Sequence, residues 1–321
     1  MKNYSITKNI NFNIVTFLKK RAIIVLLLAF IVYMVIAKPA FYTWGNITNI
    51  LTEMSVYGIA ALAMTVAIIG GEFDLSASSV FGWATVFFIS MTNTLGLVPA
   101  FFLTIISGIL MGMVNGFLVS KVKLNAFVAT MATMIIIKGL TFFYTGGAPI
   151  NTSNETLISI GAFNIAGITV TPIVFVIVLV VFTFILRKTR FGRNIYATGG
   201  NYHVAYLTGI NVSFYKFIIF VIVGLCSALA GILLCVRVQA GSALYGKDLA
   251  LFSIAATVIG GTSLSGGNGG VTKTLVGLLV MSVLFNALTL LGVQGYFQQL
   301  IRGIVLIAVI MIDTGINKRK S

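Results

Sequence analysis

Residues 51–92 read LTEMSVYGIAALAMTVAIIGGEFDLSASSVFGWATVFFISMT, two long apolar runs with a Gly-Gly pair and a short polar turn between them. A helix needs about 20 apolar residues to cross the hydrocarbon core of a membrane. Inside lipid such a helix satisfies its own backbone hydrogen bonds, whereas the polar turn needs a protein or water partner. The stretch therefore predicts two membrane-crossing helices, at about 51–70 and 74–92, with a helix break between them.

The composition extends this prediction to the whole chain of 321 residues, of which 59% are hydrophobic and 8% are charged. Soluble globular domains have about 45–50% apolar and about 25% charged residues. So few charges cannot cover a water-facing surface, and so much hydrophobicity excludes a disordered chain. Two cysteines exclude a disulfide-rich scaffold. The composition predicts an all-α, polytopic membrane protein without a soluble domain.

Further apolar runs of similar length follow one another along the chain, and Gly or Pro interrupts several of them. We expect about ten transmembrane helices, within a range of eight to eleven and with some of them broken, at 22–37, 51–70, 74–92, 97–119, 124–143, 170–186, 215–235, 249–264, 272–291 and 297–313. The expected domains are an N-terminal segment at 1–21, a transmembrane domain at 22–313 and a C-terminal tail at 314–321.

The net charge of +15, from 21 Lys and Arg against 6 Asp and Glu, has two interpretations. A basic protein can bind nucleic acid, but the cytoplasmic loops of membrane proteins also carry excess Lys and Arg. With ten spans, the side that holds both termini carries all but five of the 21 cations, the exceptions being Lys38, Lys138, Arg237, Lys247 and Arg302. The basic excess therefore predicts two cytoplasmic termini and leaves no need for a nucleic-acid partner.

Only two of the expected loops are long. Residues 144–169 fall on the outer side, and their partly apolar centre is compatible with a short interfacial helix. Residues 187–214 fall on the cytoplasmic side, where four cations in the first seven positions precede a Gly-Gly pair and a short helical stretch that ends at Gly209. Since neither loop holds an enzyme domain, the energy for any transport must come from another chain.

Two Gly-rich breaks at membrane depth are the candidate translocation pathway. Irregular backbone at that depth is tolerated only against protein or a water-filled path, and ionisable residues there are costly and usually functional. The candidate residues are Gly70, Gly71, Glu72, Asp74, Ser76, Gly260, Gly261, Ser265 and Asn268. Alternatively, Asp74 or Ser76 caps the next helix, because unpaired N–H groups at a helix start favour a carboxylate. We favour capping for Asp74, which is compatible with lining a path.

The two breaks resemble each other, with IGGEFDLS at 69–76 and IGGTSLS at 259–265. Chance and an internal repeat both explain this similarity, since repeats are frequent in transporter folds. Elsewhere, Gly108, Gly112 and Gly116 form a small-residue stripe that predicts close helix packing. The single histidine of the chain excludes a His-based metal site, and we expect no metal, cofactor or catalytic residue.

Four stretches together resemble the permease subunits of bacterial ABC importers for ribose-type sugars. They are GGEFDLSASSVFG at 70–82, ATGGNYHVAYLTGINVSFYKF at 197–217, VIGGTSLSGGNGGVTKTLVG at 258–277 and GVQGYFQQLIRGIVLIAVIMID at 292–313. The similarity runs from about residue 45 to residue 313 and keeps the order of the motifs. It implies the permease fold of type II ABC importers.

The resemblance implies a non-enzymatic permease subunit that imports a monosaccharide, a ribose-like sugar or a related polyol, across the bacterial plasma membrane. Besides the lipid bilayer, its implied partners are a second permease subunit, cytoplasmic ATPase subunits and an extracytoplasmic solute-binding protein. The loop that docks the ATPase maps onto Asn201, Ala205, Gly209 and Ile210. The chain departs from the family pattern at Tyr202 and His203, where members often carry acidic residues, and this puts the charge pairing at the docking surface in doubt.

Two alternatives remain at this stage. Glu72 and Asp74 at membrane depth are compatible with an ion-coupled secondary transporter of a small polar solute. ABC permeases for branched-chain amino acids share the broader architecture, although the motifs are closer to the sugar branch.

Overall fold

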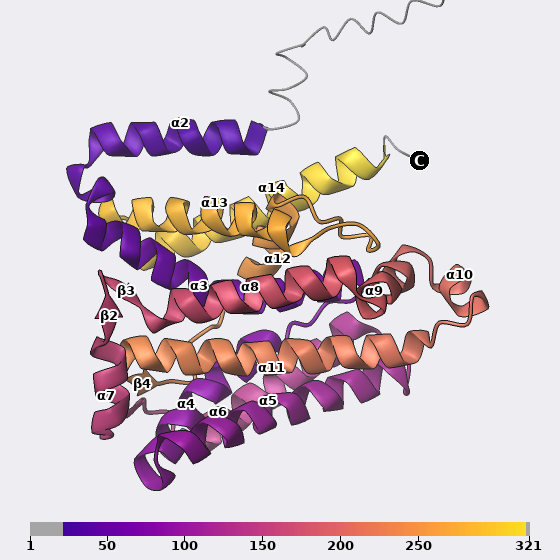
Figure 1. Cartoon of the computed structure of the whole chain (residues 1–321), viewed down its shortest axis with the longest axis horizontal. Coiled ribbons are helices and arrows are strands. Elements are labelled where there is room, and N and C mark those ends of the chain that lie inside the picture. Colours follow the sequence, from indigo (N-terminus) through magenta and orange to yellow (C-terminus); the bar gives the residue numbers. More distant parts are fainter. Residues whose placement is uncertain (1–21, 319–321) are drawn as a thin grey trace, which may run out of the picture.

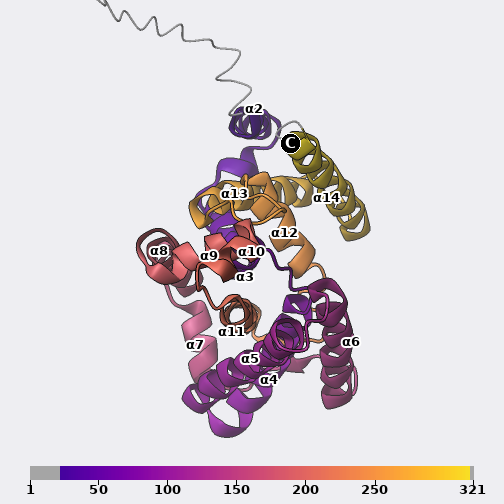
Figure 2. The same cartoon turned by 90° about the vertical axis from the view of Figure 1, so that its right-hand side faces the viewer.

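The computed structural model of the protein describes residues 22–318. The expected N-terminal segment at 1–21 and residues 319–321 of the expected tail lie outside the described residues. Within the described part, the long helices run side by side along one axis (Figure 1). An end-on view shows them gathered into a bundle, with α2 and α14 at one side and α4, α5 and α6 at the other (Figure 2).

Helices dominate the described residues, and the few strands are two residues long. The helices are α2 (Ala22–Ala37), the 3₁₀ turn η1 (Pro39–Tyr42), α3 (Trp44–Ile69), α4 (Ala77–Leu95), α5 (Leu97–Ser120), α6 (Ala126–Thr145), α7 (Glu155–Ala162), α8 (Val170–Lys188), α9 (Arg190–Gly200), α10 (Tyr202–Leu207), α11 (Val212–Val238), α12 (Leu249–Ile259), α13 (Val271–Leu290) and α14 (Gly295–Lys318). The strands pair antiparallel, β1 (Ile150–Asn151) with β4 (Ala240–Gly241) and β2 (Asn164–Ile165) with β3 (Ile168–Thr169).

The structure confirms an all-α polytopic membrane protein but does not support the count of ten spans. Every expected segment is helical, yet among the described residues only six helices are long and apolar enough to cross a membrane: α3, α5, α6, α8, α11 and α13. The expected span at 249–264 is wrong in length, because α12 ends at Ile259. Its 11 residues rise about 16 Å, roughly half of a hydrocarbon core of about 30 Å. At the other extreme, α14 continues past residue 313 to Lys318.

Helix α3 lies at the centre of the bundle, and 89% of its most apolar stretch is buried. Helices α8, α11, α12 and α13 pack around it. The Thr65 hydroxyl of α3 lies 3.1 Å from the Thr257 hydroxyl of α12 and 2.7 Å from the Thr274 hydroxyl of α13. Hydroxyl groups that bond across helices hold transmembrane segments together where lipid supplies no hydrophobic drive. This contact ties the half-length α12 to the centre of the bundle.

The outer helices expose apolar side chains. Only 22% of the most apolar stretch is buried in α5 and in α8. Phe143 on α6 is 87% exposed and Ile36 on α2 is 78% exposed. Water-soluble monomers rarely expose large continuous apolar surfaces, so this surface fits contact with lipid tails.

The bundle has two chemically different ends, which we call the α7 end and the α10 end. The α7 end carries α7, η1 and the four strands, whereas the α10 end carries α9, α10 and the turns at 121–125 and 260–270 (Figure 1). Helix α2 runs toward the α7 end and α14 runs back toward the α10 end, so the described parts nearest the two termini lie on the α10 side (Figure 1). The loop 144–169 contains a short helix, α7, as expected, and its place at the membrane interface stays a prediction.

Candidate functional site

Three Gly-Gly pairs meet at the α10 end, and we call this cluster the glycine contact. It consists of Gly70 and Gly71 after α3, Gly199 and Gly200 at the end of α9, and Gly266 and Gly267 between α12 and α13. The backbone N–H of Gly267 donates to the carbonyl of Ile69 at 2.8 Å. A Cβ atom on Gly266 would lie 2.6 Å from the carbonyl oxygen of Gly199, and one on Gly267 would lie 2.5 Å from the Cα of Gly200. These distances leave no room for a side chain, so the glycines let three backbone segments touch.

Both Gly-rich breaks end their helices with the same turn. After α3, Gly71 N–H donates to Ile68 O and Glu72 N–H donates to Ala67 O, at 3.0 and 2.9 Å. The corresponding bonds after α12 join Gly261 to Val258 and Thr262 to Thr257, at 2.8 and 3.2 Å. This is the Schellman pattern, in which a glycine with positive φ ends a helix. Gly71 has φ +80° and Gly261 has φ +96°.

Asp74 is fully buried and bonded within its own turn. Its Oδ1 accepts hydrogen bonds from the Ser76 N–H at 2.9 Å and from the Ser76 hydroxyl at 2.6 Å. The Asn115 amide of α5 donates to the same hydroxyl at 2.6 Å. Ser76 is the residue before α4, but its side chain makes no capping bond. The carboxylate of Asp74 therefore fixes the turn before α4 and does not cap the helix, because a cap accepts from the N2 or N3 N–H groups and Ser76 is the N-cap residue itself.

Glu72 forms an ion pair with Lys216 near the start of α11, and its side chain is only 7% exposed. The Lys216 ammonium also lies 5.7 Å from the ring centre of Tyr202 on α10. Three elements of the α10 end, the turn after α3, α10 and α11, thus converge on one lysine. Neither Glu72 nor Asp74 lines either of the two cavities described below.

The second break is built by backbone bonds within its own loop. The N–H of Ser263 donates to the carbonyl of Asn268 at 3.0 Å, and the N–H of Ser265 donates to the Ser263 hydroxyl at 3.3 Å. The Tyr196 hydroxyl of α9 donates to the carbonyl of Gly269 at 2.9 Å. The loop of Ser265 and Asn268 is therefore attached to α9 at two places, through this tyrosine and through the glycine contact.

The short helix α10 is defined by the residues expected to dock an ATPase. Asn201 caps it by accepting from the Val204 N–H at 3.1 Å, and Ala205 is buried against its neighbours. Gly209, with φ +83°, ends it, and the N–H of Ile210 donates back to Ala205 O at 3.1 Å. The outer face of α10 consists of exposed, largely apolar side chains, at Tyr202, Val204, Tyr206 and Leu207.

The glycine stripe of α5 lies against α11. A Cβ atom on Gly108 would lie 2.7 Å from the Gly224 carbonyl oxygen, and one on Gly116 would lie 2.8 Å from the Phe217 carbonyl oxygen. Gly112 is equally close to α11, at Phe220. The stripe lets the two helix backbones approach along their lengths, as small residues at four-residue spacing do in membranes.

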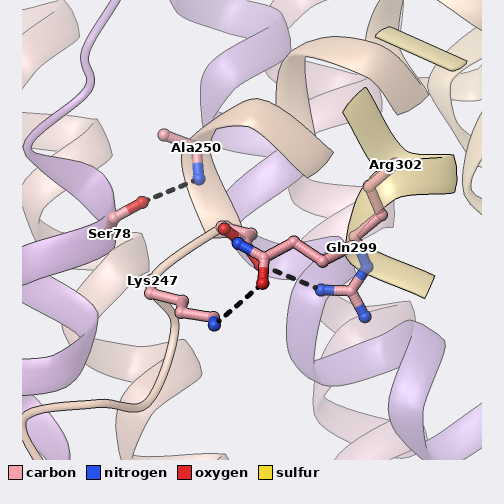
Figure 3. Close-up of polar contacts among 6 residues, drawn as sticks. Ser78, Lys247, Ala250, Gln299 and Arg302 are labelled. Carbon is pink, nitrogen blue, oxygen red and sulfur yellow. Dashed lines mark hydrogen bonds and ion pairs between the residues drawn. The ribbon is translucent and has the colours of Figure 1, made fainter. Parts of the chain in front are cut away.

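A polar cavity of about 180 Å³ lies where α12 begins, and we call it the outer cavity. Its lining combines four charged side chains with aromatic rings from α3, α12 and α13, the residues being Glu53, Tyr57, Leu244, Tyr245, Gly246, Lys247, Asp248, Leu249, Phe252, Ser282, Phe285 and Arg302. Arg302 Nη1 lies 3.4 Å from Asp248 Oδ2, and Lys247 Nζ donates to Gln299 Oε1 at 3.3 Å (Figure 3). In the same view, Ser78 of α4 accepts from the Ala250 N–H at 3.0 Å (Figure 3).

The charged residues of the outer cavity were not among the sequence candidates. One signal pointed to them, since Arg302 and Lys247 are two of the five cations that break the expected charge asymmetry. The two helices that end in the Gly-rich breaks, α3 and α12, both line this cavity. The decisive pairing of Asp248 with Arg302 joins residues 54 positions apart, and no local pattern marks it.

Known proteins resemble this chain over most of its length. The family described as branched-chain amino acid transport system / permease component matches residues 46–310. The ribose import permease protein RbsC of Haemophilus influenzae is 36% identical, over 97% of this chain and 98% of its own length. RbsC of Bacillus subtilis is 38% identical over 87% of each chain. The L-arabinose transport system permease protein AraH of Escherichia coli is 35% identical, over 88% of this chain and 86% of its own length.

No solved structure matches the chain. The family match covers the glycine contact, the stripe of α5, α10 and the outer cavity, and the relatives cover 87–97% of this chain. The chain therefore belongs to the permease-component family of the branched-chain amino acid transport system, and the relatives described above are sugar permeases of that family.

Proposed function

We propose that this chain is the permease subunit of an ATP-driven ABC importer for a monosaccharide, a ribose-like sugar or a related polyol. The observation that carries the proposal is the exposed apolar surface of α10 at Val204, Tyr206 and Leu207, which lies at the basic end of the bundle. The relatives named for ribose and arabinose supply the substrate class. The family's printed name refers to branched-chain amino acids, but these relatives favour the sugar branch.

The charge distribution supports an orientation with the α10 end in the cytoplasm. This end carries most of the cations outside the helices' apolar stretches, including Lys121, Lys123, Arg190, Arg193 and Lys273. Cytoplasmic loops are enriched in Lys and Arg. With that orientation in the bacterial plasma membrane, both termini would be cytoplasmic. Residues 22–313 would form the transmembrane domain, with docking loop 187–214 and tail 314–321.

The ATPase subunit would bind at α10 and transmit its movements to the permease there. An ATPase subunit that covers Tyr206 and Leu207 would bury apolar surface now exposed to water, which favours binding. Since α10 follows α9, and α9 touches the turns after α3 and before α13 through the glycine contact, a movement of α10 would reach both Gly-rich breaks. Gly70, Gly71, Gly260 and Gly261 would then act in coupling at the cytoplasmic side. A second permease subunit and a solute-binding protein at the α7 end would complete the importer.

Reconstitution tests this function directly. Proteoliposomes that contain the chain with its ATPase should accumulate D-ribose or another monosaccharide only when ATP is inside and a sugar-loaded binding protein is outside. A protonophore should leave uptake unchanged while ATP is constant. Uptake that collapses with the protonophore would instead identify an ion-coupled carrier, and ATP hydrolysis that never responds to the loaded binding protein would refute the importer.

A further inference from the structure

A second cavity adjoins the outer cavity on the side of the α10 end, and we call it the inner cavity. It also has a volume of about 180 Å³ and is lined by Asp248, Leu251, Phe252, Ala255, Met281, Gln299, Arg302, Gly303 and Leu306. The residues that line both cavities are Asp248, Phe252 and Arg302. Along α12 and α14, the inner cavity reaches residues nearer the α10 end, such as Ala255 and Leu306. The ion pair of Asp248 and Arg302 therefore stands in the wall between two cavities that follow each other along the bundle.

Asp248 and Arg302 do not use all of their hydrogen-bond donors and acceptors within the protein. The guanidinium of Arg302 gives one long bond of 3.4 Å to Asp248 and lies 4.7 Å from the ring centre of Phe285. Its Nε is buried and has no hydrogen-bond partner. A guanidinium presents five N–H donors, and a buried donor without a partner costs about 1–3 kcal/mol. The side chain of Asp248, although it stands just before α12, makes no capping bond to that helix. Both groups therefore retain unused hydrogen-bonding capacity, and both residues line the two cavities.

The chemistry of the lining fits a neutral solute rich in hydroxyl groups. The outer cavity has two carboxylates, Glu53 and Asp248, and two cations, Lys247 and Arg302, so its formal charge is balanced. A charged solute of either sign would find no net counter-charge there. Hydroxyl groups both donate and accept, so they can bond to carboxylates and to the guanidinium. The rings of Tyr57 and Phe252, with centres 5.3 Å apart, add apolar faces for the C–H side of a sugar ring.

We infer that the Asp248–Arg302 pair is a sugar-binding gate within the permease, where hydroxyl groups of the solute replace the bonds between α12 and α14. The inference rests on the proposed transport function and extends it, because it gives the permease a selectivity site of its own. Two polar bonds, Asp248 with Arg302 and Lys247 with Gln299, join the start of α12 to α14 (Figure 3). A polyhydroxylated solute that takes over these bonds lets α12 and α14 separate without leaving either charged group short of a hydrogen-bond partner. The outer cavity would then open into the inner one.

Thermal unfolding of the purified chain in detergent measures binding without any partner protein. The probes are D-ribose, L-arabinose and xylitol at 100 mM, compared with the same concentration of sucrose to correct for general osmolyte stabilisation. A ligand that binds only the folded state raises its stability, so at least one probe should raise the Tm of the wild type beyond the sucrose effect. The double variant Asp248→Asn/Arg302→Gln removes both charges together, which avoids leaving one of them unpaired. It should lose at least half of that probe-specific shift.

Two further variants separate recognition from structure. Arg302→Lys keeps the charge but lacks the planar fork of donors, so it should also lose at least half of the shift, whereas a purely structural ion pair would survive this change. Lys38→Gln removes an exposed cation that lines neither cavity and should behave as wild type. Wild-type shifts in both Arg302 variants, or no probe-specific shift in the wild type, would overturn the gate.

Uptake in proteoliposomes distinguishes failure of the gate from failure of the proposed function. If the wild type transports a sugar, the double variant should transport it at least tenfold more slowly at equal membrane abundance. Transport at the wild-type rate would overturn the gate and leave the importer intact. A probe-specific shift that depends on Asp248 and Arg302, combined with no ATP-dependent uptake of any sugar, would support the binding site and refute the importer.

Discussion

At the scale of single residues, Glu72 is a buried carboxylate whose role is set by its ion pair. Its sequence position suggested a translocation path, but its side chain pairs with Lys216 at the α10 end. The lysine is about a quarter exposed, at 27%, whereas the glutamate is almost buried. Removing one partner of a buried pair leaves the other charge uncompensated. The pair therefore holds the turn after α3 to α11 beside the expected docking helix.

Replacing Glu72 by Gln should destabilise the protein, because Lys216 then loses the carboxylate that neutralises it. The partial exposure of the lysine limits the effect through solvent screening, so we expect a loss of about 1–2 kcal/mol and a Tm several degrees lower in detergent. The double variant Glu72→Gln/Lys216→Gln should recover at least half of this loss. Equal Tm values for the wild type and Glu72→Gln would show that the pair contributes nothing.

At the scale of elements, α9 connects α10, the proposed docking helix, to both Gly-rich breaks. The connection depends on backbone contact, since Gly199 stands against the end of α3 and Gly266 stands against Gly199. A close-packed contact of this kind transmits displacement because it has no side chain that can change rotamer. The roles of helix α10 and of the glycine contact can therefore be tested with separate variants.

Gly199→Ala should impair coupling, because the added methyl group would overlap the carbonyl of Ile69 and displace α9. Overpacking of this kind costs about 1–3 kcal/mol, so we expect a lower Tm and at least a fivefold slower uptake. Gly139→Ala is the matched control, since this glycine of α6 has open space around it. Wild-type uptake by Gly199→Ala would exclude the glycine contact from coupling.

Leu207→Asp tests the docking face of α10 without touching the bundle. Leu207 is 81% exposed, so a carboxylate there should not affect folding, but it would place a charge in an apolar interface. We expect normal membrane abundance, loss of the ATPase from co-purified complexes and at least tenfold slower uptake. Val122 is an exposed apolar residue in a different turn of the same end. Val122→Asp should still co-purify with the ATPase and transport at the wild-type rate. Unchanged co-purification of the ATPase by Leu207→Asp would place the docking surface elsewhere.

At the scale of the whole molecule, the proposed orientation predicts that a reagent outside the cell reaches the α7 end and does not reach the α10 end. Cys226 and Cys235 are both buried, so single cysteines can be introduced over a low background. Ile165→Cys, at the α7 end, should react with a membrane-impermeant maleimide in intact cells. His203→Cys, in α10, should react only after the membrane is permeabilised. The reverse pattern would overturn the proposed orientation. Labelling of both positions in intact cells would contradict the placement of the two ends on opposite sides of the membrane.

Much of the architecture could be predicted from the sequence because lipid imposes local rules. Apolar runs became helices, the Gly-Gly pairs at 70–71 and 260–261 became helix ends, and Asn201 and Gly209 became the two limits of a short helix. The predicted span at 249–264 was too long, because the turn at Gly260 and Gly261 ends α12 at Ile259. The loop before α12 folds onto Ser78 of α4. The role of that loop depends on a contact between distant segments.

The sequence by itself determined the membrane class, the positions of the helices and the family. Hydropathy, glycine spacing and charge asymmetry act over a few residues, within the reach of one helix or turn. Only the tertiary structure decided that Glu72 pairs with Lys216, that three Gly-Gly pairs meet, and that Asp248 faces Arg302 between two cavities. The physical reason is that these contacts join residues far apart in the chain, and their energy depends on distance and burial, which arise only when the helices pack.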